Sequence, residues 1–492
     1  MTIMNTSNLK PQCVFDEFLR ITEIPRPSKH EEKMSLYLQQ WGKDHGLETK
    51  ADAVGNVLIK KPATPGMENR QTVILQSHMD MVCESNSDVS IDFCNDPIQT
   101  EIITDANGDE WLTAKGTTLG ADDGIGCAMQ LAVLASQDIE HGPIEALFTV
   151  DEETGMTGAE NLQPDFMSGK LLINLDSEDE GQIFISCAGG CVNDVTFHYK
   201  KEEPAAGLFF LELSVKNLVG GHSGDDINKK RANAIKLLSR FLYLEDERYG
   251  IHIADIQAGN KHNAIPREGR VIFAVPEAKK HEVKADFNIF LAGVKEEFCC
   301  CDPDITMTLN SANEQALIEE CVGRNILRAL HAVHNGVLAN CQQKELDWLV
   351  ETSSNLASIH TGDTEAKVIL SPRSCVMSNL QNIANSISAT FQLAGAEVVQ
   401  TDGYPAWEMK QDSVLRPLAK ETYTRLFGKE PDIIGIHAGL ECALFAQKYP
   451  ELDMISTGPT LRGVHSPDEK LLIKTVPMVW DHLIEILRNI PE

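Results

Sequence analysis

The chain has 492 residues and a formal net charge of −30 at pH 7, because 73 acidic residues outnumber 43 Lys and Arg. This length exceeds one ordinary hydrophobic core, so we expect two or more domains. So acidic a surface repels nucleic acid and anionic membranes, which excludes both as principal partners. The 13 Cys include Cys299-Cys300-Cys301 but no paired CxxC spacing, which indicates reduced thiols in a cytoplasmic protein.

The opening of the chain predicts a helix and a hairpin. Met1–Lys10 lacks the apolar core of a signal peptide, and no later run approaches the length of a membrane span. Ser28-Lys29-His30-Glu31 has the form of a capping box, which predicts a helix to about His45 with Gly46 as its stop. A short hairpin that ends in Val57–Lys60 follows.

Three continuous apolar runs predict strands that are buried on both faces. Each run ends at acidic or histidine residues: Thr72–Gln76 at His78 and Asp80, Ile144–Val150 at Asp151-Glu152-Glu153, and Leu171–Leu175 at Asp176. Strands that alternate with helices favour an α/β fold with a parallel or mixed sheet flanked by helices. In such sheets the functional crevice lies beyond the carboxyl ends of the strands, which is where each cluster stands.

A second domain is expected at 189–402, inserted between a first part at 1–188 and a returning part at 403–492. Its predicted strands are Leu208–Val215, Ile251–Gln257, Arg270–Val275, Ile305–Leu309 and Lys367–Leu370. Its predicted helices are Ala232–Leu244, Lys279–Glu297, Glu314–Ala332 and Gln381–Leu393. This mixture indicates an α+β domain. The returning part predicts a helix at Ser413–Phe427, a strand near Asp453–Ser456 and a last helix at Thr475–Arg488.

An acidic pair, Asp122 and Asp123, stands between glycines just before Cys127–Ser136, the apolar run of a buried helix. Adjacent carboxylates would repel a phosphate at this helix N-terminus. A multivalent cation fits better, because a carboxylate with two free oxygens can bridge two metal ions. The alternative is that Asp122 or Asp123 merely caps the helix.

Two further pairs lie at strand ends. His78 and Asp80 share one face of their strand, so a zinc-ligating imidazole can be oriented by the carboxylate beside it; the alternative is a surface pair. Glu152 and Glu153 repel each other unless a cation or a proton compensates. One of them can ligate metal while the other, with a raised pKa, takes a proton from metal-bound water; the alternative is a solvated acidic loop.

Asp176 and His465 complete the candidate set. Asp176 lies nearest the end of its strand. His465 precedes Ser466-Pro467-Asp468-Glu469, which has the form of a helix start and does not account for the histidine; a lone loop histidine is more often solvated. With Asp122 shared, two ions would each receive one His, one terminal carboxylate and one arm of the bridge, a mixture that zinc accepts.

These residues resemble the co-catalytic di-zinc peptidase family that contains carboxypeptidase G, the acetylornithine and succinyl-diaminopimelate deacylases and the aminoacyl-histidine dipeptidases. The resemblance rests on Ser77-His78-Met79-Asp80, Gly120-Ala121-Asp122-Asp123-Gly124, Glu152-Glu153-Thr154-Gly155, Asn174-Leu175-Asp176-Ser177-Glu178, Gly220-Gly221-His222-Ser223-Gly224, Asn263-Ala264-Ile265-Pro266-Arg267-Glu268 and His465-Ser466-Pro467-Asp468-Glu469. Over the whole length it is closest to the bacterial aminoacyl-histidine dipeptidase branch, through 117–122 and 437–442. Asp123 departs from that branch, which often carries Asn there.

The resemblance implies two Zn²⁺ per subunit, with Co²⁺ or Mn²⁺ as substitutes. It assigns His78 and Asp176 to one ion, Glu153 and His465 to the other, and Asp122 to both. It also implies that Asp80 orients a ligand and that Glu152 is the general base for a water between the ions.

In the inserted domain, the resemblance implies a lid whose residues contact the substrate. His222, Asn263 and Arg373 match the contacts to the scissile carbonyl and the substrate carboxylate, with Arg267 as a rival to Arg373. Gly439 would contribute a backbone contact.

The implied activity is metal-dependent hydrolysis of unblocked dipeptides, with His preferred at the second position, as in β-Ala-His. The resemblance also implies a homodimer formed through the lid, with His222 offered within its own subunit or across the interface. Two alternatives remain: an N-acyl amino acid deacylase of the same family, and a non-catalytic metal-dependent binding protein, which would have an incomplete site.

Overall fold

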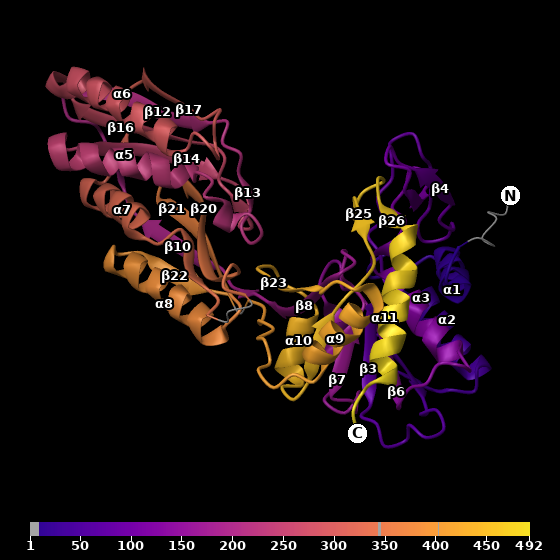
Figure 1. The fold of residues 1–492 in the computed structure, drawn as a ribbon. Helices are drawn as coiled ribbons and strands as arrows, with labels where there is room; N and C mark the ends of the chain where they lie inside the picture. The colour runs from indigo at the N-terminus through magenta and orange to yellow at the C-terminus, as the bar shows by residue number, and fades with distance from the viewer. Residues whose placement is uncertain (1–8, 343–345, 402) are drawn as a thin grey trace. The chain divides into compact units, whose positions relative to one another are not determined.

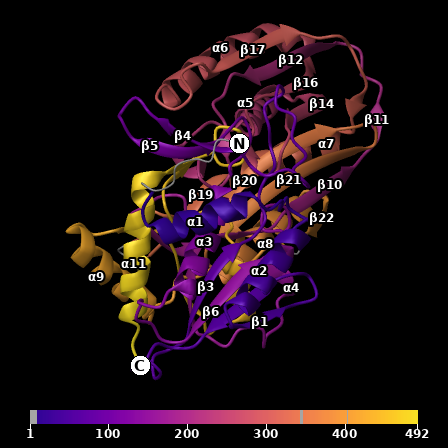
Figure 2. The ribbon, with the colours of Figure 1, turned by 90° about the vertical axis from the view of Figure 1, so that its right-hand side faces the viewer.

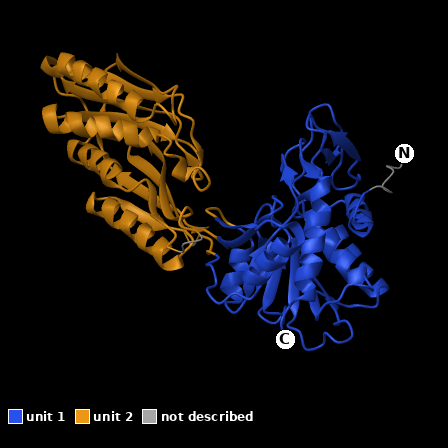
Figure 3. Ribbon diagram, viewed as in Figure 1, with its two compact units in different colours: residues 1–186, 407–435, 440–492 blue, residues 187–406, 436–439 orange. Residues whose placement is uncertain are grey.

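The computed structural model describes residues 9–342, 346–401 and 403–492. Most of the opening stretch Met1–Lys10, and residue 402 at the end of the predicted inserted domain, lie outside the described residues. The chain divides into two compact units (Figure 3). Unit 1 consists of the described residues up to Ser186 with Trp407–Gly435 and Leu440–Glu492, and unit 2 consists of Cys187–Ala406 with Ile436–Gly439.

Unit 1 is built on an eight-stranded sheet with the order β1-β2-β6-β3-β7-β24-β8-β23. Its strands are β1 (Glu48–Ala51), β2 (Val57–Lys61), β3 (Val73–His78), β6 (Ile144–Thr149), β7 (Leu171–Asn174), β8 (Gln182–Cys187), β23 (Asp432–Ile436) and β24 (Asp453–Ser456). The neighbours β6, β3, β7 and β24 are parallel, whereas β1 and β2 are antiparallel. Every residue of β3, β6 and β7 is buried, so both faces of the sheet are covered. The predicted mixed α/β sheet is confirmed.

The described part of unit 1 also contains seven α-helices, a short 3-10 helix at Ile473–Thr475 and a small sheet. Figures 1 and 2 show how the α-helices are arranged around the eight-stranded sheet. The helices are α1 (Gln12–Thr22), α2 (Glu32–Asp44), α3 (Ala121–Ala135), α4 (Thr157–Asn161), α9 (Leu415–Phe427), α10 (Cys442–Lys448) and α11 (Val476–Arg488). The small sheet consists of β4 (Thr100–Thr104), β5 (Glu110–Ala114), β25 (Leu461–Arg462) and β26 (Lys470–Leu472). Among the described residues, no helix is both long and apolar enough to cross a membrane.

The predicted capping box at Ser28–Glu31 is wrong. Helix α2 starts at Glu32, and the side chain of Glu31 does not cap it. Ser28 Oγ instead donates to Asp80 Oδ2 at 2.8 Å, and Glu31 Oε1 accepts from the N–H of Asp151 at 3.0 Å. Both side chains are held by partners far away in the sequence, at the ends of β3 and β6.

The predicted helix start at Ser466–Glu469 is also wrong. These residues form turns that lead into β26, which pairs antiparallel with β5. The carboxylate of Glu469 accepts backbone hydrogen bonds from the segment 119–122 instead of serving a helix of its own. Strand pairing and this buried carboxylate outweigh the local helix signal.

Unit 2 contains a ten-stranded antiparallel sheet with the order β17-β12-β16-β14-β20-β21-β10-β22, in which β19 pairs with β20 and β9 with β21. The strands are β9 (Gly189–Gly190), β10 (Asn193–His198), β12 (Leu208–Lys216), β14 (His252–Gly259), β16 (Gly269–Pro276), β17 (Thr306–Ser311), β19 (Gly336–Asn340), β20 (Val350–Thr361), β21 (Glu365–Ser374) and β22 (Glu397–Gln400). Two small ladders join β11 (Lys201–Glu202) to β18 (Leu317–Ile318) and β13 (Gly221–His222) to β15 (Ala264–Ile265).

One apolar core lies between this sheet and its helices. The helices are α5 (Ala234–Tyr249), α6 (Lys280–Glu297), α7 (Glu320–Ala332) and α8 (Met377–Leu393). Phe241 of α5, Phe287 of α6, Leu327 of α7 and Phe391 of α8 share the core with strand residues such as Phe273. Figure 1 shows the four helices side by side along the sheet. The predicted α+β character of the inserted segment is confirmed.

Candidate metal centre

Unit 1 brings the five predicted metal ligands together. His78 ends β3, Asp122 lies at the start of α3, Glu153 follows β6, Asp176 follows β7, and His465 lies between β25 and β26. Because β3, β6 and β7 are parallel neighbours, their carboxyl ends meet at one edge of the sheet. Donor atoms of His78, Asp122 and Glu153 all lie within 4.8 Å of one another.

Asp122 lies between the two histidines. Its Oδ1 is 3.1 Å from His78 Nε2, and its Oδ2 is 3.2 Å from His465 Nε2. Each imidazole also faces a second carboxylate: Asp176 Oδ1 is 3.4 Å from His78 Nε2, and Glu153 Oε2 is 2.9 Å from His465 Nε2. The result is two sets of one nitrogen, one terminal carboxylate and one arm of Asp122, which is a donor mixture that zinc accepts.

The charges of this cluster also fit metal ions. Hydrogen bonds to Asp122 and Glu153 raise the pKa of His465 to about 10. Burial acts to lower the pKa of His78, but Asp176, Asp122 and Asp80 raise it well above its ordinary value. In the metal-free chain, protons on the two histidines therefore supply positive charge that a metal ion would replace.

Zinc binding should release protons near neutral pH. The raised pKa of His465 keeps its ring protonated in the metal-free chain, whereas a ligating imidazole must be neutral. Apparent zinc affinity should therefore rise with pH, by up to about tenfold per pH unit for each proton displaced. Calorimetric titration in two buffers of different ionisation enthalpy measures the number of protons released, and a value of zero would contradict the protonated state.

Asp80 contacts both a predicted ligand, His78, and the loop that carries Glu152 and Glu153. Its Oδ1 accepts from the N–H of Glu152 at 3.0 Å, its Oδ2 accepts from the N–H of Glu153 at 3.2 Å, and its Oδ1 lies 3.3 Å from His78 Nδ1. One carboxylate thus positions both the imidazole and the acidic loop.

Burial raises the pKa of Glu152 to about 8, and Glu441, Glu153 and Asp122 act in the same direction. A carboxyl group that exchanges its proton near neutrality suits a general base.

The two aspartates of the Gly-rich turn have different partners. The backbone of α3 is non-helical at Asp122 and Asp123, so the regular helix begins after them. Asp123 Oδ1 accepts from the N–H of Gly126 at 3.1 Å, so the capping alternative holds for Asp123. Burial raises the pKa of Asp123 to about 8. Asp122, joined to it by a cis peptide bond, directs both oxygens to histidines.

The predicted substrate residues all belong to unit 2. His222 lies on β13, with Nδ1 3.3 Å from Asp225 Oδ2, which leaves Nε2 for another partner. The carbonyl of Asn263 accepts from the N–H of Ser223, the neighbour of His222, at 2.9 Å. Arg373 lies on β21. A hydrogen bond with His222 and the charge of Arg373 both lower the pKa of Asp225, so these three side chains lie close together.

The two candidate arginines differ in their partners. Arg373 is 6% exposed, and its Nε has no hydrogen-bond partner in the part of the chain that the structure describes. Arg267 Nε, by contrast, donates to the carbonyl of Leu218 at 3.0 Å. A buried guanidinium with an open donor is the better candidate for a substrate carboxylate. Gly439 lies against Tyr404, where a Cβ would come within 3.0 Å of the ring.

Two buried residues of the motif 437–442 were not predicted as site residues. Glu441 Oε2 accepts from Gln76 Nε2 at 2.6 Å and from Thr149 Oγ1 at 3.0 Å, and burial raises its pKa to about 7. His437 Nε2 lies 2.7 Å from Ser353 Oγ in unit 2, and burial lowers the pKa of His437 to about 3. The motif was the available signal, but its spacing does not show which side chains turn inward.

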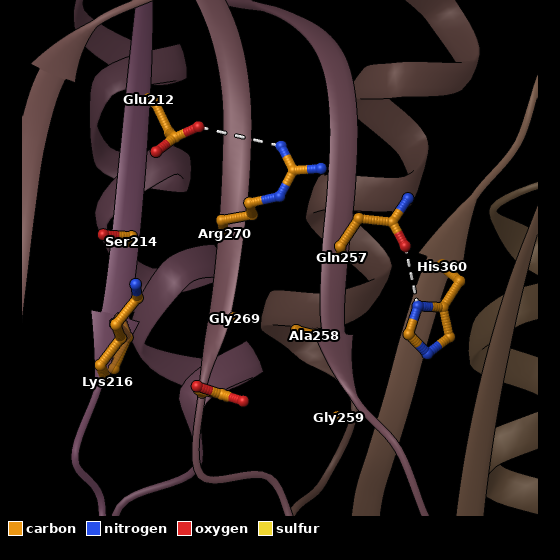
Figure 4. A pocket seen from close by; sticks show the side chains of 11 residues that line it. Glu212, Ser214, Lys216, Gln257, Ala258, Gly259, Gly269, Arg270 and His360 are labelled. Carbon is orange, nitrogen blue, oxygen red and sulfur yellow. Dashed lines mark hydrogen bonds and ion pairs between the residues drawn. The ribbon is translucent and has the colours of Figure 1, made fainter.

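A separate hollow of about 270 Å³ lies on the sheet of unit 2 (Figure 4). Two of its lining side chains have polar partners: Arg270 lies 3.8 Å from Glu212 and 3.1 Å from Asp255, and His360 Nδ1 lies 2.9 Å from Gln257 Oε1. It contains none of the predicted site residues.

The fold and the paired metal donors define a metallopeptidase, and comparison with known proteins agrees. The model of the peptidase family M20/M25/M40 matches residues 74–489, so the chain belongs to this family. The family indicated by the sequence motifs is thereby confirmed.

Two relatives match almost the entire chain at 42% and 41% identity. The cytosol non-specific dipeptidase of Escherichia coli is 42% identical over 486 residues, which cover 99% of each chain. The crystal structure of aminoacylhistidine dipeptidase from Vibrio alginolyticus is 41% identical and has a TM-score of 0.94, covering 99% of this chain and 98% of that one. Aminopeptidase PepT from Bacillus cereus shares the fold, with a TM-score of 0.57 and 16% identity over 98% of this chain and 100% of that one.

Proposed function

We propose that this chain is a two-zinc dipeptidase that hydrolyses unblocked dipeptides and prefers histidine at the second position. The observation that carries the proposal is Asp122, whose two oxygens each face a different histidine at 3.1 and 3.2 Å. Family membership and the two full-length relatives support peptide hydrolysis as the reaction. All five donors and a general base are present, which argues against a non-catalytic binding protein.

Each zinc ion would take one histidine and one terminal carboxylate. His78 and Asp176 would hold the first, Glu153 and His465 the second, and Asp122 would bridge them. Cobalt or manganese could replace zinc, because they accept the same nitrogen and oxygen donors. When bound, the ions would activate a water molecule and polarise the scissile carbonyl.

The residues of the chain would carry the proton transfers. Glu152 removes a proton from the attacking water, the water oxygen bonds to the carbonyl carbon, and Glu152 then delivers the proton to the leaving amine as the C–N bond breaks. His222, whose Nδ1 lies 3.3 Å from Asp225 Oδ2, would donate from Nε2 to the oxyanion. Asn263 and the backbone at Gly439 would hold the peptide.

The preference for short, unblocked substrates rests on Arg373. A bidentate guanidinium that binds the terminal carboxylate limits the distance between that carboxylate and the scissile bond. The preference for histidine follows the name of the Vibrio relative, whereas the Escherichia coli relative is called non-specific. We therefore expect activity on several dipeptides, with Xaa-His the fastest.

A substrate comparison tests the proposal. Zinc-loaded protein is assayed for release of His from β-Ala-His and from Gly-His, for release of Leu from Gly-Leu, and for release of acetate from acetylornithine. The proposal expects dipeptide hydrolysis at least about 100-fold more efficient than deacylation, with Xaa-His fastest. Faster acetate release would identify a deacylase, and zinc binding without any hydrolysis would identify a binding protein.

Arg373→Met should lower kcat/KM for β-Ala-His about 100-fold, mainly through KM, because a charge-assisted carboxylate contact is lost. The matched control is Arg267→Met, which removes a guanidinium that donates to the carbonyl of Leu218 and should change kcat/KM less than about threefold. The C-terminal amide of β-Ala-His should be a poor substrate for both wild type and Arg373→Met. Equal losses in the two variants would contradict the assignment.

We further propose a cytosolic location and a homodimer formed through unit 2. The location is supported by the net charge of −30 and by the full-length relative of Escherichia coli, which is named a cytosol dipeptidase. Sedimentation analysis of the full chain tests the dimer.

A further inference from the structure

Arg26 is a fully buried arginine whose partners are backbone carbonyls. It is 1% exposed. Its Nη1 donates to the carbonyls of Met79 at 3.1 Å and Asp80 at 2.6 Å, and its Nη2 donates to the carbonyl of Gly120. Among the described residues, no carboxylate lies within ion-pair distance of this guanidinium. Burying a charge without an ion partner is costly, so these contacts must matter to the local structure.

Gly120 and Gly124, which flank Asp122 and Asp123, make room for this guanidinium. A Cβ at Gly120 would come within 2.6 Å of Arg26 Nη2, and so would a Cβ at Gly124. Gly120 also has a φ of +69°, which favours glycine. The glycines that flank Asp122 and Asp123 therefore accommodate Arg26 rather than a phosphate.

The carboxylate of Glu469 binds the backbone N–H groups of the same turn. Its Oε2 accepts from the N–H of Leu119 at 2.7 Å and of Gly120 at 2.9 Å. Its Oε1 accepts from the N–H of Ala121 at 2.8 Å and of Asp122 at 3.3 Å. Four consecutive N–H groups thus share one carboxylate that is 2% exposed.

We propose that Arg26 and Glu469 are positioning residues that form the metal site before any metal binds. Arg26 joins the end of β3, which carries His78, to the turn that carries Asp122. Glu469 joins that turn to the loop that carries His465. The inference rests on the proposed metal site.

The chemistry of these contacts explains why they suit this role. Arg26 and Glu469 bind backbone carbonyl and N–H groups. The side-chain oxygens of Asp80 and Asp122 therefore stay available for the histidines and for metal. Partners that orient metal ligands typically contribute about 10- to 100-fold to metal affinity. A turn fixed by two buried charges needs no rearrangement when the ions enter.

Hydrogen exchange of the wild-type chain tests the inference without any variant. The amides of residues 119–122 should exchange slowly in the metal-free protein and should slow no further when zinc is added. If removal of zinc exposes these amides to fast exchange, the metal holds the turn and the inference is overturned.

Variants give the second test, with zinc affinity measured by competition with a chelator. Glu469→Gln places an amide N–H₂ against backbone N–H groups, and Arg26→Lys cannot reach three carbonyls, so each should weaken zinc binding about 10- to 100-fold. Glu145→Gln is the matched control, because Glu145 accepts from the N–H of Ser168 and Gly169 at the other end of β6. It should lower the melting temperature but leave zinc affinity within about threefold.

The outcomes separate the inference from the proposed function. Folded Glu469→Gln and Arg26→Lys proteins with wild-type zinc affinity, or an equal loss in Glu145→Gln, would overturn the positioning roles alone. If the wild-type chain binds no zinc, the proposed function fails, while the exchange of residues 119–122 still shows whether the turn is fixed. If the variants do not fold, the exchange experiment decides.

Discussion

Replacing Glu152 by Gln should lower kcat for β-Ala-His by about 10³- to 10⁴-fold, while the zinc content stays as in the wild type. Glutamine keeps the shape of the side chain but cannot accept a proton. Glu152 is assigned to no ion, whereas its neighbour Glu153 lies 2.9 Å from His465 Nε2. Loss of turnover without loss of metal therefore separates the base from the ligands.

The pH profile gives a second measure of the same variant. In the metal-free chain, burial and the nearby carboxylates raise the pKa of Glu152 to about 8, so the proton is held at neutral pH. Bound cations oppose those carboxylates and lower this pKa, which makes the deprotonated base available. The acidic limb of kcat/KM should be present in wild type and absent from the residual activity of Glu152→Gln.

Glu145→Gln is the control for this prediction too. Glu145 lies at the start of β6, and Glu152 lies just beyond the end of the same strand. Both variants therefore replace a glutamate by glutamine in or next to β6. The control should keep kcat within about threefold of wild type. A Glu152→Gln protein with wild-type kcat would mean that another group removes the proton; the buried Glu441, which raises the pKa of Glu152, is a candidate.

The strands that carry the site could be predicted because their signal is local. The continuous apolar runs of β3, β6 and β7 are what full burial on two faces requires. Parallel pairing then places their final residues at one edge, so His78, Glu153 and Asp176 converge without further information. The paired carboxylates and histidines at those ends were visible in the sequence for the same reason.

Strand β20 could not be predicted, although it lies at the centre of unit 2. Its sequence, Val350–Thr361, contains serine, threonine and asparagine where an apolar run or a clean alternation is expected. These residues are buried because they bind other parts of the unit: Ser353 binds His437, and Asn355 Nδ2 donates to the carbonyl of Ala264 at 2.8 Å. Hydropathy does not report a strand whose polar side chains are satisfied by distant partners.

The two wrong helix starts have a related cause. Ser28 and Glu469 belong to sequences that match helix-capping patterns, and each side chain binds a site loop instead. A capping pattern shows which hydrogen bonds a side chain can make locally but not whether a distant backbone competes for it. Arg26 gave no sequence signal, because its role depends on two turns about 50 and 90 residues away.

Asp122→Asn should reduce bound zinc from two ions per chain to one or fewer and lower kcat/KM by at least about 10³-fold. The carboxylate presents one oxygen to His78 at 3.1 Å and the other to His465 at 3.2 Å. Asparagine keeps one oxygen, and its N–H₂ group cannot ligate a cation. Zinc content after dialysis, measured by atomic spectroscopy, reports the loss directly.

The adjacent residue provides the control. Asp123 caps the helix through the N–H of Gly126, and its raised pKa of about 8 keeps it neutral near pH 7, so Asn is a close replacement. Asp123→Asn should keep two zinc ions and lose no more than about 1 kcal/mol of stability. Two ions in Asp122→Asn would contradict the bridge, because no other described carboxylate has one oxygen within 4 Å of each histidine's Nε2. Loss of metal only in Asp122→Asn would show that the site depends on the carboxylate of Asp122, since both variants replace a carboxyl group by an amide in the same turn.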